Sequence, residues 1–216
     1  MTKGQFAELR KGVVKRRTKR RLSLFINGIN LDRATRRLDK KIDLSRLVEG
    51  LCGGLTPEIA RYYTLVPYED DARQFAFLEA VERAGLEVIV KRLPPKGVKR
   101  QVSMDVHIAT DLMSFSLNRS SLLQEGFSQE NYVGISKVVN GNTVAEEPIP
   151  DEEAQSVKKI AVLVCPSREI TYAIHTAHCA GVETHLADFG LYGTSDGWKG
   201  VDRWIDLSTS ETIWRD

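Results

Sequence analysis

The chain has little cysteine: Cys52, Cys165 and Cys179 are its only three, and no two of them form a CxxC pair. An odd number of scattered cysteines argues against the disulfide framework of a small secreted protein. Cys179 lies close to His175 and His178 in sequence, but all three fall on one expected helix and no second pair of ligands accompanies them. A structural zinc site is therefore not expected.

Long apolar runs are also missing. No stretch approaches the roughly 18 apolar residues of a membrane span, and the basic N-terminus has no apolar segment of the kind found in signal peptides. Hydrophobic residues make up 42% and charged residues 28% of the 216 residues, as in an ordinary folded protein. We expect one α/β domain with extensions, located in the cytoplasm and without membrane contact.

Charge is unevenly distributed along the chain. Residues 1–21 contain nine Lys or Arg, including Lys15, Arg16 and Arg17, but only one acid, Glu8. A basic arm of this kind commonly contacts phosphates, although a solvated extension or a nuclear localisation signal has the same composition. Between 146 and 153 the charge is entirely acidic, which fits either a solvated linker or a segment that covers a basic groove.

Strand-like and helix-like segments alternate after the arm, a pattern typical of βαβ units and a parallel sheet. We expect an α/β fold, a three-layer α/β/α sandwich with a mostly parallel sheet of about five strands. The domain would span 22–207, with an insertion at about 116–157 and a tail at 208–216. Expected strands are 22–26, 59–66, 86–90, 159–165 and 182–187; expected helices are 43–51, 69–85, 104–115 and 168–180; 201–207 is a short helix or strand.

Two segments place polar residues beside the carboxyl edge of this sheet, where open α/β folds bind ligands. The first strand runs directly into Asn27 and Asn30. The segment after the third strand is basic and could hold phosphates or form a solvated rim; its basic residues are Lys91, Arg92, Lys96, Lys99 and Arg100. Trp198, Trp204 and Trp214, further along the chain, are expected to be packing residues.

The helix at 104–115 carries two aspartates with different expected surroundings. Asp105 falls within an apolar arc that includes Val106, Ile108 and Phe115. There it either caps the helix or holds a cation. Asp111 falls roughly 120° away on the polar side of the helix, so periodicity predicts a solvated acid.

Three segments together resemble the NYN family of PIN-like nucleases, in the LabA-like branch. They are LFINGINL at 24–31, RYY at 61–63 and KRQVSMDVHIATD at 99–111, and VDRWIDL at 201–207 is similar to the closing element of the family. The resemblance implies an α/β/α sandwich with acidic residues over the carboxyl edge of the sheet. It also implies RNA as the partner and Mg²⁺ or Mn²⁺ as the cofactor, because clustered carboxylates hold these ions and the ions activate water for phosphodiester cleavage.

Carried over residue by residue, the resemblance makes Asp105 the acid at the helix entry and Asp111 the second acid of that helix, while Asn27 and Glu169 occupy two further acidic positions. These four residues are the expected metal and catalytic residues. Asn30 matches the asparagine of the first motif. Together with Ser167, Arg168, the basic segment and the arm, it is expected to contact nucleic acid.

The departures from the family pattern leave fewer acidic residues at the expected site. Asn27 and Ser167 stand where acids are expected, and Arg168 adds a positive charge. Asn27 could be an introduced substitution, the site could be reorganised around one ion, or catalysis could be lost and binding kept. The leading hypothesis is a metal-dependent ribonuclease. The alternatives are an inactive nucleic-acid-binding module and a protein-interaction scaffold, with a homodimer possible in each case.

Overall fold

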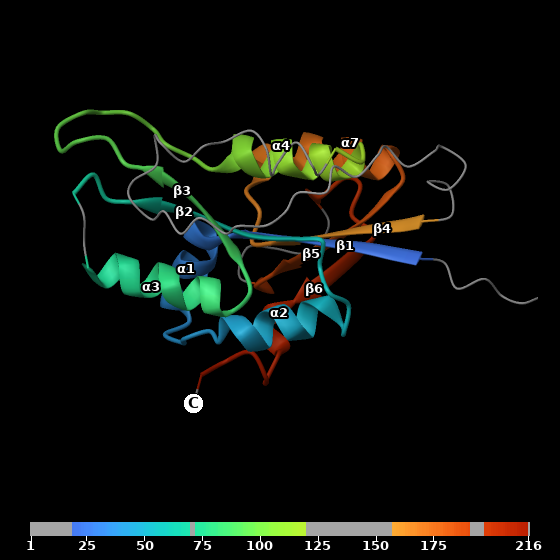
Figure 1. Ribbon diagram of the computed structural model, residues 1–216, viewed down its shortest axis with the longest axis horizontal. Helices are drawn as coiled ribbons and strands as arrows, with labels where there is room; N and C mark the ends of the chain where they lie inside the picture. Colours follow the sequence, from blue (N-terminus) through green and yellow to red (C-terminus); the bar gives the residue numbers. More distant parts are fainter. Residues whose placement is uncertain (1–18, 70–71, 120–156, 191–196, 216) are drawn as a thin grey trace, which may run out of the picture.

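A single six-stranded parallel sheet forms the centre of the computed structural model, which describes residues 19–69, 72–119, 157–190 and 197–215 (Figure 1). The strand order is β3-β2-β1-β4-β5-β6 and every neighbouring pair is parallel. The strands are β1 (Lys19–Asn27), β2 (Ile59–Val66), β3 (Glu87–Arg92), β4 (Val157–Val164), β5 (Val182–Asp188) and β6 (Arg203–Asp206).

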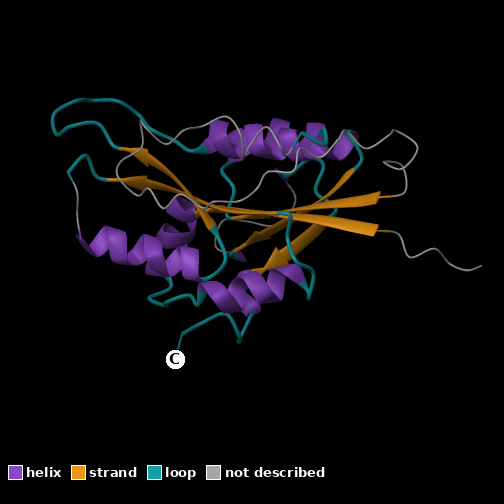
Figure 2. Ribbon diagram, viewed as in Figure 1, coloured by secondary structure: helices purple, strands orange, loops and turns teal. Residues whose placement is uncertain are grey.

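Helices cover both faces of this sheet and make three layers (Figure 2). One face carries α1 (Gly28–Arg37), α2 (Leu44–Cys52) and α3 (Ala72–Arg83), and the other carries α4 (Asp105–Ser116) and α7 (Thr171–Cys179). Two short 3₁₀ turns, η3 (Arg168–Ile170) and η6 (Leu207–Thr209), follow β4 and β6. The expected α/β/α sandwich is therefore confirmed, with six strands in the sheet.

The central strand β1 shows why both faces need cover. Its side chains alternate between the faces: Leu24 and Ile26 pack in the cluster beneath α1, α2 and α3, while Phe25 packs in the cluster beneath α4 and α7. A strand buried on both faces has a nearly continuous apolar sequence, as 22–26 does. Asn27 follows Phe25 by two residues and so belongs to the α4 and α7 face.

Chain direction across the sheet reverses between β1 and β4. The first half of the chain builds outward from β1 through β2 to β3, and the second half returns to β4 beside β1 and builds outward through β5 to β6. In open α/β sheets, such a reversal opens a crevice outside the carboxyl ends of the two strands, and ligands bind there. The loops after β1 and β4 are thus the first place to look for a site.

The structure adds a helix that the sequence reading did not include. α1 begins directly after β1, and its cap is Asn27, whose Oδ1 accepts a hydrogen bond from the Asn30 backbone amide at 3.2 Å. Gly28 is required at this entry, because a Cβ there would lie 2.3 Å from ring atoms of Tyr62. The segment 201–207 resolves into strand β6 followed by η6, and 168–170 forms η3 before α7 begins.

Residues after β6 pack back onto the domain. Trp214 lies with its ring centre 5.8 Å from that of Phe189, and the Asp43 amide donates to the Ile213 carbonyl at 2.7 Å. Among the described residues, no helix is both long and apolar enough to cross a membrane. The arm with Lys15, Arg16 and Arg17, and most of the insertion expected at 116–157, lie outside the described residues.

Candidate functional site at the carboxyl edge of the sheet

The first turn of α1 and the loop after β4 are joined across the point where the sheet direction reverses. The Asn30 side-chain amide donates to the Cys165 carbonyl at 3.1 Å, and the Cys165 amide donates to the Ala187 carbonyl at 2.8 Å. Cys165 is held between these bonds with φ +49°, in the left-handed region that residues other than glycine rarely adopt. Strained backbone of this kind is concentrated at binding and catalytic sites.

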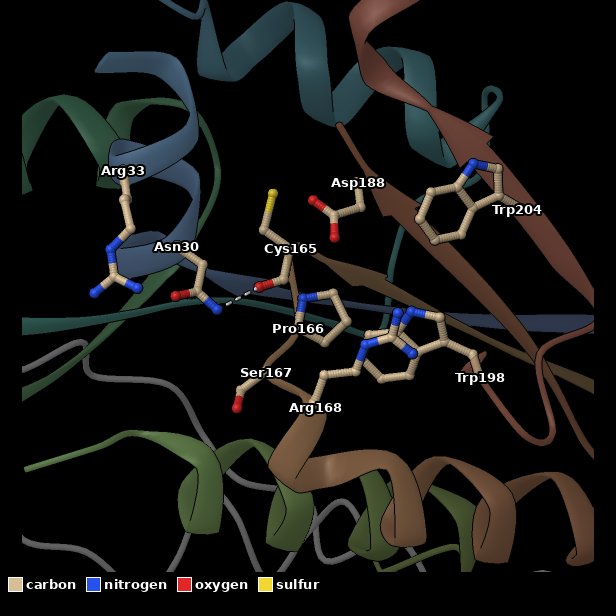
Figure 3. Close-up of a pocket in the computed structure, with 9 residues that line it drawn as sticks. All are labelled: Asn30, Arg33, Cys165, Pro166, Ser167, Arg168, Asp188, Trp198 and Trp204. Carbon is tan, nitrogen blue, oxygen red and sulfur yellow. Dashed lines mark hydrogen bonds between the residues drawn. The ribbon is translucent and has the colours of Figure 1, made fainter. Parts of the chain in front are cut away.

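A cavity of about 260 Å³ opens beside this junction (Figure 3). Its walls come from α1, the loop after β4 with η3, the end of β5, and β6 with the segment that leads into it. The lining residues are Asn30, Arg33, Cys165, Pro166, Ser167, Arg168, Asp188, Trp198 and Trp204. Asn30, Ser167 and Arg168, three residues predicted to contact nucleic acid, thus line one cavity.

Arg168 is placed in this cavity by two residues from the segment before β6. Its guanidinium carbon lies 4.4 Å from the centre of the Trp198 ring, within the range of a cation–π contact. Gly197 leaves the room for it, because a Cβ at that position would lie 2.6 Å from Arg168 Nη1. All three tryptophans pack against the core clusters, as predicted, and Trp198 and Trp204 also line the cavity.

Asp188, at the end of β5, is a cavity residue that the sequence reading missed. Its side chain is buried, its Oδ1 accepts a hydrogen bond from the Phe189 amide at 2.8 Å, and it is hydrogen-bonded with the Cys165 thiol. Burial raises the pKa of Asp188 above the ordinary carboxyl value, and Asp206 nearby adds to the rise, although the hydrogen bonds and Arg168 oppose it. Its place as the last residue of the strand before Phe189 is the signal that could have identified it.

Asp105 is the first residue of α4 and is partly buried. Its Oδ2 accepts a hydrogen bond from the Ser103 hydroxyl at 2.6 Å, and the same hydroxyl accepts from the Asp105 amide at 2.9 Å. Met104, just before it, packs in the same cluster as Phe25 and Tyr63 of the neighbouring strands β1 and β2. Asp105 therefore begins α4 on the sheet face to which Asn27 belongs.

Asp111 does not behave as the solvated acid that periodicity predicted. It is only 7% exposed, and its Oδ2 accepts hydrogen bonds from Arg61 Nη1 at 2.8 Å and from the Tyr63 hydroxyl at 2.6 Å. Val106, expected in the apolar arc, is instead 74% exposed. Because Arg61 already balances the Asp111 charge, this acid joins α4 to β2, and the site proposed below does not include it.

The basic segment between β3 and α4 is anchored at one end and exposed along its length. Lys91 Nζ donates to the Ser103 carbonyl at 3.3 Å, which links the end of β3 to the residues that precede α4. Arg92 donates to the Tyr68 carbonyl. The remaining basic side chains of the segment, those of Lys96, Lys99 and Arg100, are exposed.

A divalent-ion site with several carboxylates is not assembled in the described part of the chain, where no three His, Cys, Asp or Glu residues gather in a metal-binding arrangement. Asn27 Oδ1 serves as the cap of α1, Asp111 is paired with Arg61, and Glu169 is exposed on η3. Mg²⁺ nevertheless needs only one or two carboxylates when substrate phosphates complete its shell. The described residues thus offer no carboxylate cluster for several ions, and a single ion at Asp105 would need further oxygens from substrate and water.

Comparison with known families bears on the first half of this site. Residues 21–122 match the model of the NYN domain. The match supports the NYN family. It includes β1, Asn27, Asn30, Asp105 and Asp111, and it suggests a nuclease of the PIN-like type. The match ends before the loop after β4, so Ser167, Arg168 and Asp188 lie outside the part that resembles the NYN model.

Among solved structures, the chain is similar to a protein of unknown function from Vibrio parahaemolyticus, with a TM-score of 0.59 and 11% sequence identity. The likeness covers 92% of this chain and 98% of the other. At this identity it supports the fold alone. No curated protein matches the sequence.

Proposed function

We propose that the protein is a metal-dependent ribonuclease of the NYN type, in the LabA-like branch. The observation that carries the proposal is the position of Asp105, in the first turn of α4 and on the sheet face to which Asn27 belongs, within the range that matches the NYN model. An acid in the first turn of a helix is favoured by the helix dipole.

One Mg²⁺ or Mn²⁺ ion would be held by Asp105, with the Asn27 carbonyl oxygen and substrate phosphate oxygens as further ligands. Such an ion, when bound, lowers the pKa of water and stabilises charge on the phosphate being cleaved. Glu169 is exposed on η3, which lies against α4, and would contribute to the ion through a bound water molecule. One neutral ligand in place of a carboxylate predicts weak ion binding.

The residues around the ion have a separate role in holding RNA. Lys96, Lys99 and Arg100 are exposed on the segment that leads into α4, so they can contact phosphates on the approach to Asp105. Asn30 and Ser167 line the neighbouring cavity, where their polar groups can contact the ribose and phosphate of the strand. The basic arm would extend the same electrostatic contact.

Cleavage of a labelled single-stranded RNA in the presence of Mn²⁺ tests the proposal. Asp105→Asn should reduce the rate at least a hundredfold, because the variant removes the one carboxylate proposed to hold the ion. Asp39→Asn is the matched control: Asp39 is exposed and has φ +51°, a conformation that asparagine also tolerates. Cleavage that survives Asp105→Asn would contradict the assignment.

A second function, binding of nucleic acid without cleavage, is favoured by the Arg168 guanidinium in the cavity. A positive charge there opposes a bound cation and attracts phosphate. This alternative predicts salt-sensitive RNA binding with or without metal, and no cleavage in Mn²⁺ that depends on Asp105.

A further inference from the structure

Arg168 adds a positive charge between two positions at which acids are expected. The resemblance to NYN nucleases implies carboxylates on both sides of it, at 167 and 169, and a metal ion between them and the substrate. In this chain Ser167 is neutral, Glu169 is exposed, and Arg168 lines the cavity between α1 and the loop after β4. A positive charge thus occupies a region in which negative charge would be needed to hold a cation.

We propose that Arg168, held against Trp198, binds a phosphate group of the RNA strand directly and so supplies there the positive charge that a second metal ion would otherwise provide. The inference rests on the proposed function in one respect, that the ligand is a nucleic acid. It does not depend on cleavage or on a bound metal.

The setting of Arg168 favours phosphate as its partner. Stacking on Trp198 occupies one face of the guanidinium and leaves its N–H groups, which lie in the plane, available to bind two phosphate oxygens at once. Gly197 is part of this arrangement, since any side chain there would collide with Arg168. A guanidinium oriented in this way loses less conformational entropy on binding than a free side chain.

Other cavity residues add to this contact or oppose it. Arg33 is exposed on α1 and contributes a second positive charge, and the Ser167 hydroxyl can donate to a phosphate oxygen. Asp188 is the acid among the lining residues, and it lies close enough to Arg168 for the two charges to interact. Its negative charge repels an anion, so the cavity should bind phosphate less tightly than it would with a neutral residue at position 188.

A nucleobase is the competing occupant of the same cavity. It would stack on the open face of the Arg168 guanidinium, and Asp188 would accept hydrogen bonds from its amino group. The two occupants predict opposite effects of Asp188→Asn. Loss of the acid tightens RNA binding if a phosphate lies beside Arg168, and weakens RNA binding if Asp188 accepts a hydrogen bond from a base.

Binding of a 3′-labelled single-stranded RNA decamer to the full chain in EDTA, followed by fluorescence anisotropy over a range of salt concentrations, tests the proposal. Arg168→Gln should raise Kd at least fivefold at 0.1 M salt and reduce the slope of log affinity against log salt by about 0.7, the value for one phosphate contact on a single strand. Arg168→Lys should keep the slope, with an intermediate Kd. Arg83→Gln, on α3 across the sheet, is the matched control and should change neither quantity.

Two further comparisons complete the test. Asp188→Asn should lower Kd, and a higher Kd would overturn the proposal in favour of base recognition. A comparison of 5′-phosphate RNA with 5′-hydroxyl RNA identifies which phosphate Arg168 contacts. Tighter binding of the 5′-phosphate RNA that is lost in Arg168→Gln means that Arg168 contacts the phosphate at the chain end. Equal binding of the two RNAs means that it contacts a phosphate within the strand. RNA binding with an unchanged slope in Arg168→Gln would overturn this inference alone, whereas no RNA binding by the wild-type chain would overturn the proposed function as well.

Discussion

Arg61 Nη1 lies 2.8 Å from Asp111 Oδ2, and both side chains are buried between β2 and α4. The Tyr63 hydroxyl donates to the same carboxylate oxygen at 2.6 Å, and Glu87 of β3 accepts from Arg61 Nε at 2.8 Å. Two strands and one helix are therefore connected through a single guanidinium. A pair of this kind is costly to break, because removal of one partner leaves the other charge buried and poorly compensated.

Asp111→Ala should lower the free energy of unfolding by about 3 kcal/mol, towards the lower end for broken buried pairs because Glu87 still balances Arg61. Urea denaturation measures the loss. Glu82→Gln on the exposed surface of α3 is the control and should stay within about 0.5 kcal/mol of wild type. If Asp111→Ala kept full stability but lost a stabilisation by Mn²⁺ seen in the wild type, Asp111 would be an ion ligand after all.

Asn27→Asp should increase Mn²⁺-dependent cleavage of RNA at least tenfold, because it restores a carboxylate at the position where the resemblance implies one. Aspartate caps a helix about as well as asparagine, so the bond to the Asn30 amide should survive. Without metal the variant should be less stable than wild type, because position 27 is only 4% exposed and the new charge is buried there. Asn27→Ala separates the two effects, since it removes the cap without adding charge and should lower stability by about 1 kcal/mol. A cleavage rate that does not rise in a folded Asn27→Asp variant would count against an ion at this position.

Gly28→Ala should destabilise the fold by about 1 to 3 kcal/mol, the usual cost of overpacking a buried position. The added Cβ would lie 2.3 Å from the Tyr62 ring, which is itself only 3% exposed and has little room to move. Thermal and urea unfolding of Gly28→Ala, Tyr62→Leu and the double variant would reveal the clash as a coupling between the two positions.

Gly50→Ala provides a matched control for Gly28→Ala. Gly50 lies within α2, and a Cβ there would have no neighbour within 4 Å. Alanine is the better helix former by about 1 kcal/mol, so this change should stabilise the protein. Equal changes in stability for the two substitutions would mean that the close approach of Tyr62 does not exclude a side chain at position 28.

Asp188→Asn should change stability in a way that depends on pH. Burial raises the pKa of Asp188 above 3.8, its ordinary value, so the stability gained from protonation is fully present below pH 3.8 and is lost as pH rises through the pKa of the folded state. At pH 7 the ionised, buried carboxylate lowers stability, and asparagine removes that penalty. The variant should be more stable than wild type at pH 7, and this difference in the free energy of unfolding should become smaller towards pH 3.5.

Glu183→Gln should show the opposite pH trend and so serves as a control. Hydrogen bonds from Lys158 and His185 lower the pKa of Glu183 below 4.5, so its contribution is present above pH 4.5 and is lost as pH falls through the pKa of the folded state. Glu183→Gln should be less stable than wild type at pH 7, with a smaller gap in acid. Urea unfolding at pH 7 and pH 3.5 measures both variants, and a gap for Asp188→Asn that is independent of pH would contradict burial as the cause.

Local sequence patterns predicted most of the sheet because each buried strand has its own apolar run. The strand ending at Asn27 and the one at 59–66 are examples. α1 was missed because Asn27, Gly28 and Asn30 follow the apolar run of β1 directly, a composition that suggested a loop. The cap formed by Asn27, and the spacing of Leu31 and Ala34 on one helix face, are the signals that identify it.

The candidate site was harder to predict because its members come from distant segments. Asp111 is buried by Arg61, fifty residues earlier in the chain, and no helical period can reveal such a partner. Asp188 and Trp198 come close to Arg168 because β4, β5 and β6 are consecutive strands of the sheet. The polar residues after β1 and β4 could be identified from sequence because parallel strands deliver their ends to one edge.

Gly197→Ala tests whether the stack of Arg168 on Trp198 matters for binding. The new Cβ would lie 2.6 Å from Arg168 Nη1. Because the end of an arginine side chain moves easily, the guanidinium should leave the Trp198 ring without unfolding the protein. The free energy of unfolding should change by less than about 0.5 kcal/mol. Loss of the oriented guanidinium should weaken RNA binding in EDTA about as much as Arg168→Gln, and the tryptophan emission spectrum should change in parallel.

Trp198→Phe separates packing from charge, since phenylalanine keeps an aromatic face for the cation and should weaken binding less than Gly197→Ala. Unchanged RNA affinity in a variant whose emission shows that the stack is broken would mean that Arg168 reaches its ligand without support from Trp198.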